Sequence, residues 1–370
     1  MVDTVKFYEY LVNHDLDFFT GVPDSLLKEL CACIKDKSDS KHNIIAANEG
    51  NAVGLAAGYH LSTGKLGVVY MQNSGEGNAV NPLMSLADPK VYSIPMLLIV
   101  GWRGEPGVHD EPQHVKQGEV TLKLLEAMDI EYRVLSDTFE DDLNAMVSLA
   151  KKENKPTALV IRKGTFSKYA PVNKEKTAMG ELLREEALSV ILEELGDDMV
   201  VSTTGKESRE IFELREKYGQ GHEHDFLTVG SMGHTSSIAL GVAIGTKRNV
   251  WCLDGDGSFI MHMGGLAIAG QNSGDNFKYV INNNAAHESV GGQPTVSDKI
   301  DIKAILKACG FSSTYEARTK EEIKECIDKM KNEGKCALIL YTKQGSRDDL
   351  GRPTTTPIQN KDAFMKEIKK

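Results

Sequence analysis

The sequence Leu253-Asp254-Gly255-Asp256-Gly257-Ser258 stands between an apolar run at residues 249–253 and a helix-like stretch at residues 259–270. Glycine allows a sharp turn and a close approach of the backbone to a ligand, and the free N–H groups at the start of a helix attract an anion. Asp256 would repel a phosphate held there unless a cation lay between them. The stretch therefore predicts a phosphate site that also holds a cation.

A second polar segment, Asn282-Asn283-Asn284, ends the next apolar run at residues 277–281. If both runs are neighbouring strands, a carboxylate, an amide oxygen and loop carbonyls meet at one point, and Mg²⁺ prefers such oxygen ligands. Either turn alone is commonplace, because Asp-Gly and Asn-Asn occur in many turns. Neither a GxGxxG turn after a strand nor a GxxxxGK[ST] loop is present in the sequence, which lowers the case for dinucleotide or P-loop chemistry.

Short apolar runs alternate with helix-like segments along the whole chain, as expected for parallel strands buried on both faces. The runs lie at residues 43–47, 67–71, 95–100, 157–161, 199–202, 249–253, 279–281 and 337–341. A polar stretch around Pro171 interrupts the alternation, which restarts with a helix-like segment at residues 181–195. We predict two doubly wound α/β domains with parallel sheets, residues 1–166 and 181–370, joined by a linker at 167–180.

The composition excludes several classes of protein. With 370 residues, 41% hydrophobic and 26% charged, the chain is neither disordered nor fibrous, and its net charge of −10 argues against a nucleic acid partner. No apolar run reaches the roughly 18 residues that cross a membrane, and residues 1–10 lack a signal pattern, so we expect a cytoplasmic protein. Because the six cysteines are scattered along the sequence, we expect reduced thiols and neither disulfides nor a zinc site. His222 and His224 are expected to lie in a solvated turn and not to bind a metal as a pair.

The spacing of the two polar turns is more specific than either turn. Gly255-Asp256-Gly257, separated by 24 residues from Asn282-Asn283, resembles the diphosphate-binding signature of thiamine diphosphate-dependent enzymes. The resemblance implies that Asp256, Asn283 and the main-chain carbonyl of Ala285 hold Mg²⁺, which bridges them to the diphosphate. The residues implied to contact the cofactor here are Gly255, Asp256, Gly257, Ser258, Asn283 and Ala285.

The segment Asn48-Glu49-Gly50-Asn51, which opens a helix rich in small residues, is similar to the element that carries the family's glutamate in a separate pyrimidine-binding domain. A partly buried carboxyl beside the pyrimidine ring can hold a proton on a ring nitrogen. Glu49 is therefore the expected catalytic residue and a cofactor contact. The plain alternative is a charge in the first turn of a helix.

Gly230-Ser231-Met232-Gly233 is a further match, followed by a small-residue helix at residues 235–245. In the family, the bulky residue of this turn lies between the two cofactor rings, so the resemblance implies that Met232, with Ser231 beside it, binds the cofactor. The alternative is a methionine that only fills the core.

The reaction is inferred from domain content. Many larger family members carry a middle domain, whereas this chain has only the short linker. The chain is similar over nearly its whole length to compact thiamine diphosphate-dependent 2-oxo acid decarboxylases, including at residues 21–25, 72–78, 101–104, 202–205, 283–289 and 345–353. We expect Mg²⁺-dependent decarboxylation of 3-phosphonopyruvate to phosphonoacetaldehyde and CO₂, a step of phosphonate biosynthesis. The alternatives are decarboxylation of sulfopyruvate, acetolactate-synthase-like carboligation, and an inactive cofactor-binding subunit.

An anionic 2-oxo acid needs cationic or hydrogen-bonding partners, and the planar fork of arginine suits a phosphonate. The expected substrate residues are Arg103, His109, His287, Arg347 and Arg352. The alternative for the arginines is ion pairing with Glu105, Asp348 or Asp349.

The proton that replaces CO₂ needs a donor close to the reacting carbon. Asp24 and Ser25 lie in a turn that resembles the place where related decarboxylases keep an acid, and His114 is a third candidate. The resemblance also implies at least a homodimer, with the active site between subunits.

Overall fold

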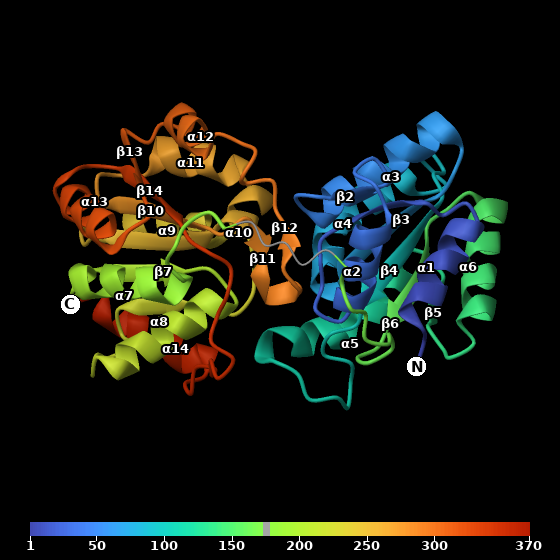
Figure 1. The fold of residues 1–370 in the computed structure, drawn as a ribbon, viewed down its shortest axis with the longest axis horizontal. Helices are drawn as coiled ribbons and strands as arrows, with labels where there is room; N and C mark the ends of the chain where they lie inside the picture. Colours follow the sequence, from blue (N-terminus) through green and yellow to red (C-terminus); the bar gives the residue numbers. More distant parts are fainter. Residues whose placement is uncertain (173–177) are drawn as a thin grey trace. The chain divides into compact units, whose positions relative to one another are not determined.

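The computed structural model describes residues 1–172 and 178–370, which form two compact units, Met1–Glu175 and Lys176–Lys370 (Figure 1). Residues 173–177, in the middle of the expected linker, lie outside the described residues. The residues on either side of the start of the expected linker lie against the first unit. Phe166 bridges to Val2, and the Tyr169 N–H donates to Glu29 Oε2 at 2.8 Å.

The first unit has a six-stranded parallel sheet in the order β2-β1-β3-β4-β6-β5. Its strands are β1 (Phe18–Gly21), β2 (Asn43–Ile45), β3 (Gly67–Gln72), β4 (Met96–Gly101), β5 (Tyr132–Val134) and β6 (Thr157–Ile161). Its helices are α1 (Thr4–Asn13), α2 (Lys28–Lys37), α3 (Glu49–Thr63), α4 (Glu76–Pro82), α5 (Pro112–Ala127) and α6 (Phe139–Glu153), with short turns η1 (Asn73–Gly75) and η2 (Leu83–Ala87).

The second unit repeats this architecture with the order β13-β14-β10-β9-β7-β8. Its strands are β7 (Met199–Ser202), β8 (Asp225–Leu227), β9 (Val250–Gly255), β10 (Phe277–Asn283), β13 (Ser313–Ala317) and β14 (Cys336–Tyr341), beside a hairpin of β11 (Ala286–His287) and β12 (Gln293–Pro294). Its helices are α7 (Arg184–Leu195), α8 (Lys206–Lys217), α9 (Thr235–Ile244), α10 (Asp256–Met261), α11 (Gly264–Asn272), α12 (Ile302–Cys309), α13 (Lys320–Asn332) and α14 (Pro357–Glu367), with a short turn η3 (Glu288–Val290).

Helices cover both faces of each sheet, which explains the continuous apolar runs. In β4, Leu97 and Ile99 pack with α1, α2 and α6, while Leu98 and Val100 pack with α3, α4 and α5. In the second unit, α7, α8 and α13 cover one face and α9, α11 and α12 the other (Figure 1). The prediction of two doubly wound parallel sheets is confirmed.

The strand order changes direction between β1 and β3 in the first unit and between β7 and β9 in the second. Ligands of open α/β sheets bind outside the carboxyl ends of the strands at such a reversal. The segments that leave these strand ends include residues 22–25 and 73–75 in the first unit, and residues 203–205 and 256–258 in the second. These segments belong to the motifs quoted from the sequence at residues 21–25, 72–78, 202–205 and 253–258.

All eight predicted runs are strands, but the short strands β1, β5, β8 and β13 were not predicted. The single helix expected at residues 259–270 was wrong: α10 begins at Asp256 and ends at Met261, and α11 starts at Gly264. The poor helix propensity of Gly264 and Gly265, which follow the break, favours this interruption. All six cysteines are free thiols, and within residues 1–172 and 178–370 no helix is long and apolar enough to cross a membrane.

Candidate active site

Glu49 is the first residue of α3, and Asn48 caps that helix by accepting a hydrogen bond from the Asn51 N–H at 3.0 Å. The Glu49 side chain is buried, with the residue 4% exposed, and Asn78 Nδ2 donates to its Oε2 at 2.7 Å. Its Oε1 lies against Gly75, where an added Cβ would approach within 2.2 Å. Burial raises the pKa of Glu49, although the Asn78 hydrogen bond opposes the shift.

Asp24 lies at the strand-order reversal of the first unit and is fully buried. Gln72 Nε2 donates to Asp24 Oδ1 at 2.6 Å, and the Leu26 N–H donates to Oδ2 at 3.1 Å. Gly101, at the end of β4, leaves room for this carboxyl, because an added Cβ would lie 2.1 Å from Asp24 Oδ2. Burial raises the pKa of Asp24, with Gln72 and then Arg103 opposing it. Burial therefore makes this acid hold its proton more tightly than an exposed aspartic acid does.

Arg103 follows β4 and reaches Asp24's neighbour, donating from Nη1 to Ser25 Oγ at 2.8 Å. Its Nε donates to Asp110 Oδ2 at 2.7 Å and its Nη2 to Asp110 Oδ1, so the guanidinium and the carboxylate form a two-point pair. Burial tends to raise the pKa of Asp110, but the Arg103 guanidinium holds that pKa well below its usual range. The ion-pair partner of Arg103 is therefore Asp110, which sequence reasoning did not consider.

His114, in the first turn of α5, is 9% exposed, and its Nδ1 has no hydrogen-bond partner among the described residues. Burial, and then the charge of Arg103, lowers the pKa of His114 to about 4. A neutral imidazole at neutral pH can accept a proton but cannot donate one as imidazolium. His109 is exposed in the loop between β4 and α5.

In the second unit, one hydroxyl joins the two principal candidate metal ligands. Ser297 Oγ lies 2.8 Å from both Asp256 Oδ2 and Asn283 Oδ1, and Thr295 Oγ1 donates to the same Asp256 oxygen. Asp256 is 3% exposed and Asn283 is fully buried. Ala285 is also buried, with a positive φ of 57°, and its carbonyl accepts from the Thr295 N–H at 3.1 Å.

The donor set fits a small divalent cation. Asp256 Oδ2, Asn283 Oδ1 and the two hydroxyls make four close oxygen–oxygen contacts, but the hydroxyls bring only two protons when Asp256 is ionised. Burial raises the pKa of Asp256 to about 6, which measures how poorly the negative charge is compensated. A buried cluster of hard oxygen atoms that has too few protons to hydrogen-bond all its contacts matches the ligand preference of Mg²⁺. These residues therefore fit the ion expected from the sequence.

The cofactor-binding candidates of the second unit also lie together. An added Cβ on Gly257 would approach His287 Nδ1 within 2.8 Å and Met232 Cε within 3.3 Å. Ser258 Oγ accepts from the Gly233 N–H at 3.0 Å, which ties residues 230–233 to the turn at 255–258. Ser231 is exposed and has a positive φ of 57°. The structure thus brings Met232, Gly257 and His287 into one cluster.

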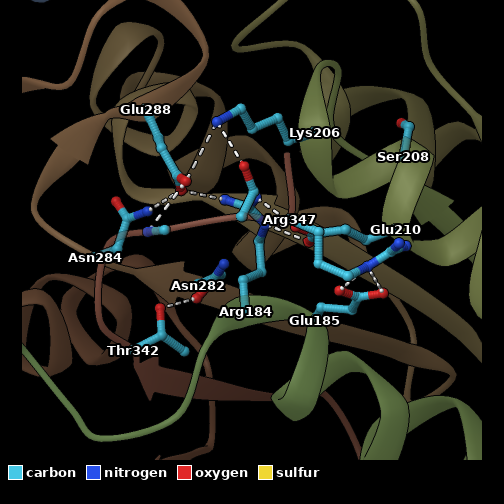
Figure 2. Close-up of polar contacts among 12 residues, drawn as sticks. Arg184, Glu185, Lys206, Ser208, Glu210, Asn282, Asn284, Glu288, Thr342 and Arg347 are labelled. Carbon is cyan, nitrogen blue, oxygen red and sulfur yellow. Dashed lines mark hydrogen bonds and ion pairs between the residues drawn. The ribbon is translucent and has the colours of Figure 1, made fainter. Parts of the chain in front are cut away.

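Arg347 pairs with three carboxylates, of which Figure 2 labels that of Glu185. It bonds to Glu185 through Nε, at 3.0 and 2.8 Å, to Asp349 Oδ1 through Nη1 at 2.9 Å, and to Glu213. This geometry favours the ion-pair alternative for Arg347 over a substrate contact. Arg352 is exposed in the segment that follows β14.

Sequence reasoning missed a second charged group, which Figure 2 shows around Glu288. Its carboxylate accepts from Arg184 Nη1 at 2.8 Å, Asn284 Nδ2 at 3.0 Å and Lys206 Nζ at 3.4 Å, and Lys206 also donates to Ser346 Oγ at 2.8 Å. Asn78, Gln72, Asp110, Thr295 and Ser297 were also missed. Asn78 and Gln72 lie in the segment 72–78 that the resemblance included, whereas Thr295 and Ser297 belong to no motif.

The sequence matches two domains of one enzyme family. Residues 5–126 match the model of the thiamine pyrophosphate enzyme N-terminal TPP binding domain, and residues 204–340 match the C-terminal TPP binding domain. The chain is 35% identical to a phosphonopyruvate decarboxylase of Streptomyces viridochromogenes over 92% of its own length and 88% of the relative's. It is 33% identical to a phosphonopyruvate decarboxylase of Streptomyces hygroscopicus, over 91% of its own length and 86% of the relative's. It is 28% identical to a sulfopyruvate decarboxylase of Methanosarcina acetivorans, over 88% of its own length and 87% of the relative's.

Proposed function

The chain belongs to the thiamine pyrophosphate enzyme family as a 2-oxo acid decarboxylase, and from that premise we propose that it converts 3-phosphonopyruvate to phosphonoacetaldehyde and CO₂ with thiamine diphosphate and Mg²⁺. The observation that carries the chemistry is the buried carboxyl of Glu49, held by Asn78 at the start of α3. The choice of substrate is supported by the matches that cover most of the chain: two phosphonopyruvate decarboxylases are 35% and 33% identical, and one sulfopyruvate decarboxylase is 28% identical.

Glu49 serves the pyrimidine ring of the cofactor. Bound thiamine diphosphate supplies a centre that stabilises negative charge on the carbon that loses CO₂. Glu49 holds a proton at a pyrimidine nitrogen, and the burial that raises its pKa favours sharing that proton with the ring over losing it to solvent. Residues 1–166 would then be the pyrimidine-binding domain.

Asp256, Asn283 and the Ala285 carbonyl would hold Mg²⁺, which would supply positive charge to balance the diphosphate. Gly257 lets the side chains of His287 and Met232 pack against the backbone of this turn, because an added Cβ would approach them within 2.8 and 3.3 Å. Residues 181–370 would form this diphosphate-binding domain.

The residues that we assign to substrate binding and to donation of the replacement proton lie in the first unit. The reaction breaks the bond between the keto carbon and the carboxylate carbon, releases CO₂, and puts one proton on the former keto carbon. Asp24, whose pKa burial raises, is the best-placed acid for that proton, with Ser25 Oγ 3.5 Å from its Oδ1. Arg103 contacts Ser25 and is the cation that orients the anionic substrate there.

The full chain, purified and supplied with thiamine diphosphate and Mg²⁺, tests the assignment by parallel assays of CO₂ release from phosphonopyruvate, sulfopyruvate and pyruvate. The proposal expects the highest kcat/KM with phosphonopyruvate and an aldehyde product that retains phosphorus. Faster turnover of sulfopyruvate would reassign the substrate, and formation of acetolactate from pyruvate would reassign the reaction. Cofactor binding with no turnover of any 2-oxo acid would indicate a subunit without activity.

The working form is expected to be a homodimer or a larger homo-oligomer, as the resemblance to the family implies. Light scattering coupled to size exclusion measures this directly. A monomer that is fully active at the concentration of the assay would contradict the expectation.

A further inference from the structure

A single tripeptide, Thr295-Val296-Ser297, contacts all three residues proposed to hold Mg²⁺. Its two hydroxyls lie on Asp256 and Asn283, and its Thr295 N–H donates to the Ala285 carbonyl at 3.1 Å. We propose that Thr295 and Ser297 are positioning residues of the metal site, which fix the oxygens of Asp256 and Asn283 at the spacing that the cation needs. This inference rests on the proposed function, because it takes that oxygen cluster to be the Mg²⁺ site.

The hydroxyls join side chains from the ends of two neighbouring strands. Asp256 directly follows β9 and Asn283 ends β10, and the two strands pair as far as Gly255 and Asn282. This pairing sets the spacing of the backbones but leaves the distance between the two side-chain oxygens open. Ser297 Oγ lies 2.8 Å from an oxygen of each. Thr295 Oγ1 lies 2.8 Å from Ser297 Oγ and donates to Asp256. A change in the Ser297 side chain therefore alters two candidate ligands at once.

Burial makes these hydrogen bonds costly to lose. Thr295 is 7% exposed and Ser297 3%, so water has little access to replace a lost hydroxyl. Both acceptors would keep their full desolvation cost if the hydroxyls were removed. Residues that hydrogen-bond to metal ligands typically change metal affinity by about 10- to 100-fold when they are substituted.

The tripeptide also connects the metal site to the small hairpin. It continues directly from β12, which pairs with β11 through Ala286 and Pro294, and β11 directly follows Ala285. A cation that draws Asp256, Asn283 and Ala285 together therefore also restrains residues 286–297. This predicts slower amide exchange in the hairpin when Mg²⁺ is bound.

Calorimetric titration of Mg²⁺ into the full chain, saturated beforehand with thiamine diphosphate, tests the proposal without an activity assay. Ser297→Ala and Thr295→Val should each weaken Mg²⁺ binding by about 10-fold or more, whereas Ser297→Thr, which keeps a hydroxyl, should stay within about threefold of wild type. The matched control is Ser273→Ala at the end of α11, because the Ser273 hydroxyl has no hydrogen-bond partner within the described ranges. Its affinity should equal that of wild type.

The outcomes separate the two claims. If the wild-type chain binds no Mg²⁺ with thiamine diphosphate present, the proposed function fails. If wild type binds Mg²⁺ and both hydroxyl-lacking variants bind it equally well, the positioning role is overturned while the proposed function stands. Hydrogen exchange of the wild-type chain covers the case of variants that do not fold: unchanged exchange of residues 286–297 on adding Mg²⁺ would also overturn the positioning role.

Discussion

Asn78 donates a hydrogen bond of 2.7 Å from Nδ2 to Oε2 of Glu49. The two residues come from different helices, α4 and α3, and the bond leaves Oε1 as the other carboxyl oxygen, lying against Gly75. Burial raises the pKa of Glu49 while this hydrogen bond lowers it, so Asn78 limits how far the pKa rises. The proton affinity of the proposed catalytic carboxyl is thus set by two opposing contributions from one unit.

Removing the side chain of Asn78 should slow the reaction and shift its pH dependence. Asn78→Ala leaves Oε2 buried without its donor, which raises the pKa of Glu49 further and should lower kcat by about 10- to 100-fold. The acidic limb of the kcat/KM profile should move to higher pH. Asn144→Ala is the control, since exposed Asn144 also makes one side-chain hydrogen bond, to the Tyr10 hydroxyl at 2.8 Å. An unshifted profile in Asn78→Ala would contradict this role.

A methyl group at position 75 should disturb the same carboxyl by contact alone. The φ of Gly75 is −81°, which any residue can adopt, but its Cβ would lie 2.2 Å from Glu49 Oε1. Gly75→Ala should reduce kcat by about 10-fold or more, by the cost of overpacking. Gly77→Ala, two residues further on in α4 and with nothing within 4 Å of the added atom, should behave as wild type. Equal activity of the two variants would rule out the contact as the cause.

Arg103 and Arg347 should differ in what their loss affects. Arg103→Lys loses the planar two-point pair with Asp110 and should raise KM for the anionic substrate by about 10-fold or more, with thiamine diphosphate binding unchanged. Arg347→Ala removes the partner of Glu185, Glu213 and Asp349, so it should lower the melting temperature and leave KM unchanged. Steady-state kinetics and thermal denaturation of both variants test which arginine affects substrate binding and which affects stability. A raised KM in Arg347→Ala alone would reverse the assignment.

Glu76 should make the protein less stable as the pH rises. It is 2% exposed, and neither carboxyl oxygen has a hydrogen-bond partner in the part of the chain that the structure describes. Burial raises the pKa of Glu76 from 4.5 to about 8, so the folded state binds the proton more tightly than the unfolded state. The stability that this proton gives is complete below pH 4.5 and is lost up to about pH 8, a loss of about 3 kcal/mol by pH 7.

Glu76→Gln keeps the shape of the side chain without the titration. Its melting temperature should exceed that of wild type at pH 8 by more than at pH 5, whereas exposed Glu140→Gln should show no such difference. The reverse trend, with Glu76→Gln relatively less stable at pH 8, would show that the carboxylate is stabilised in the folded state.

The sequence was most informative where chemistry requires particular residues at particular strand ends. The strand run before Asp254 and the turn around Asp256 could be predicted, because buried parallel strands are continuously apolar and glycine marks the turn that follows them. The three-residue strands β5 and β8 could not, since they are too short to show a period. The doubly wound fold followed from the alternation and is confirmed.

The partners of the site residues were not predictable, for a different reason. Asp110, seven residues after Arg103, could equally have faced solvent, and Ser297 reaches Asp256 from 41 residues away. Such contacts depend on how a loop returns to the sheet, which no local pattern encodes. Arg347 illustrates the same limit, because its position beside Glu185 and Glu213 comes from packing of the segment after β14 against α7 and α8.

The most direct test compares CO₂ release from phosphonopyruvate by the wild-type chain and by Glu49→Gln, each saturated with thiamine diphosphate and Mg²⁺, with cofactor binding measured on the same samples. Glutamine keeps the volume and can still accept from Asn78, but it cannot exchange a proton with the cofactor. The account predicts that Glu49→Gln binds the cofactor and releases CO₂ at least about 100-fold more slowly than wild type, in the range of general acid–base catalysis. Equal rates of CO₂ release from the two proteins would contradict it.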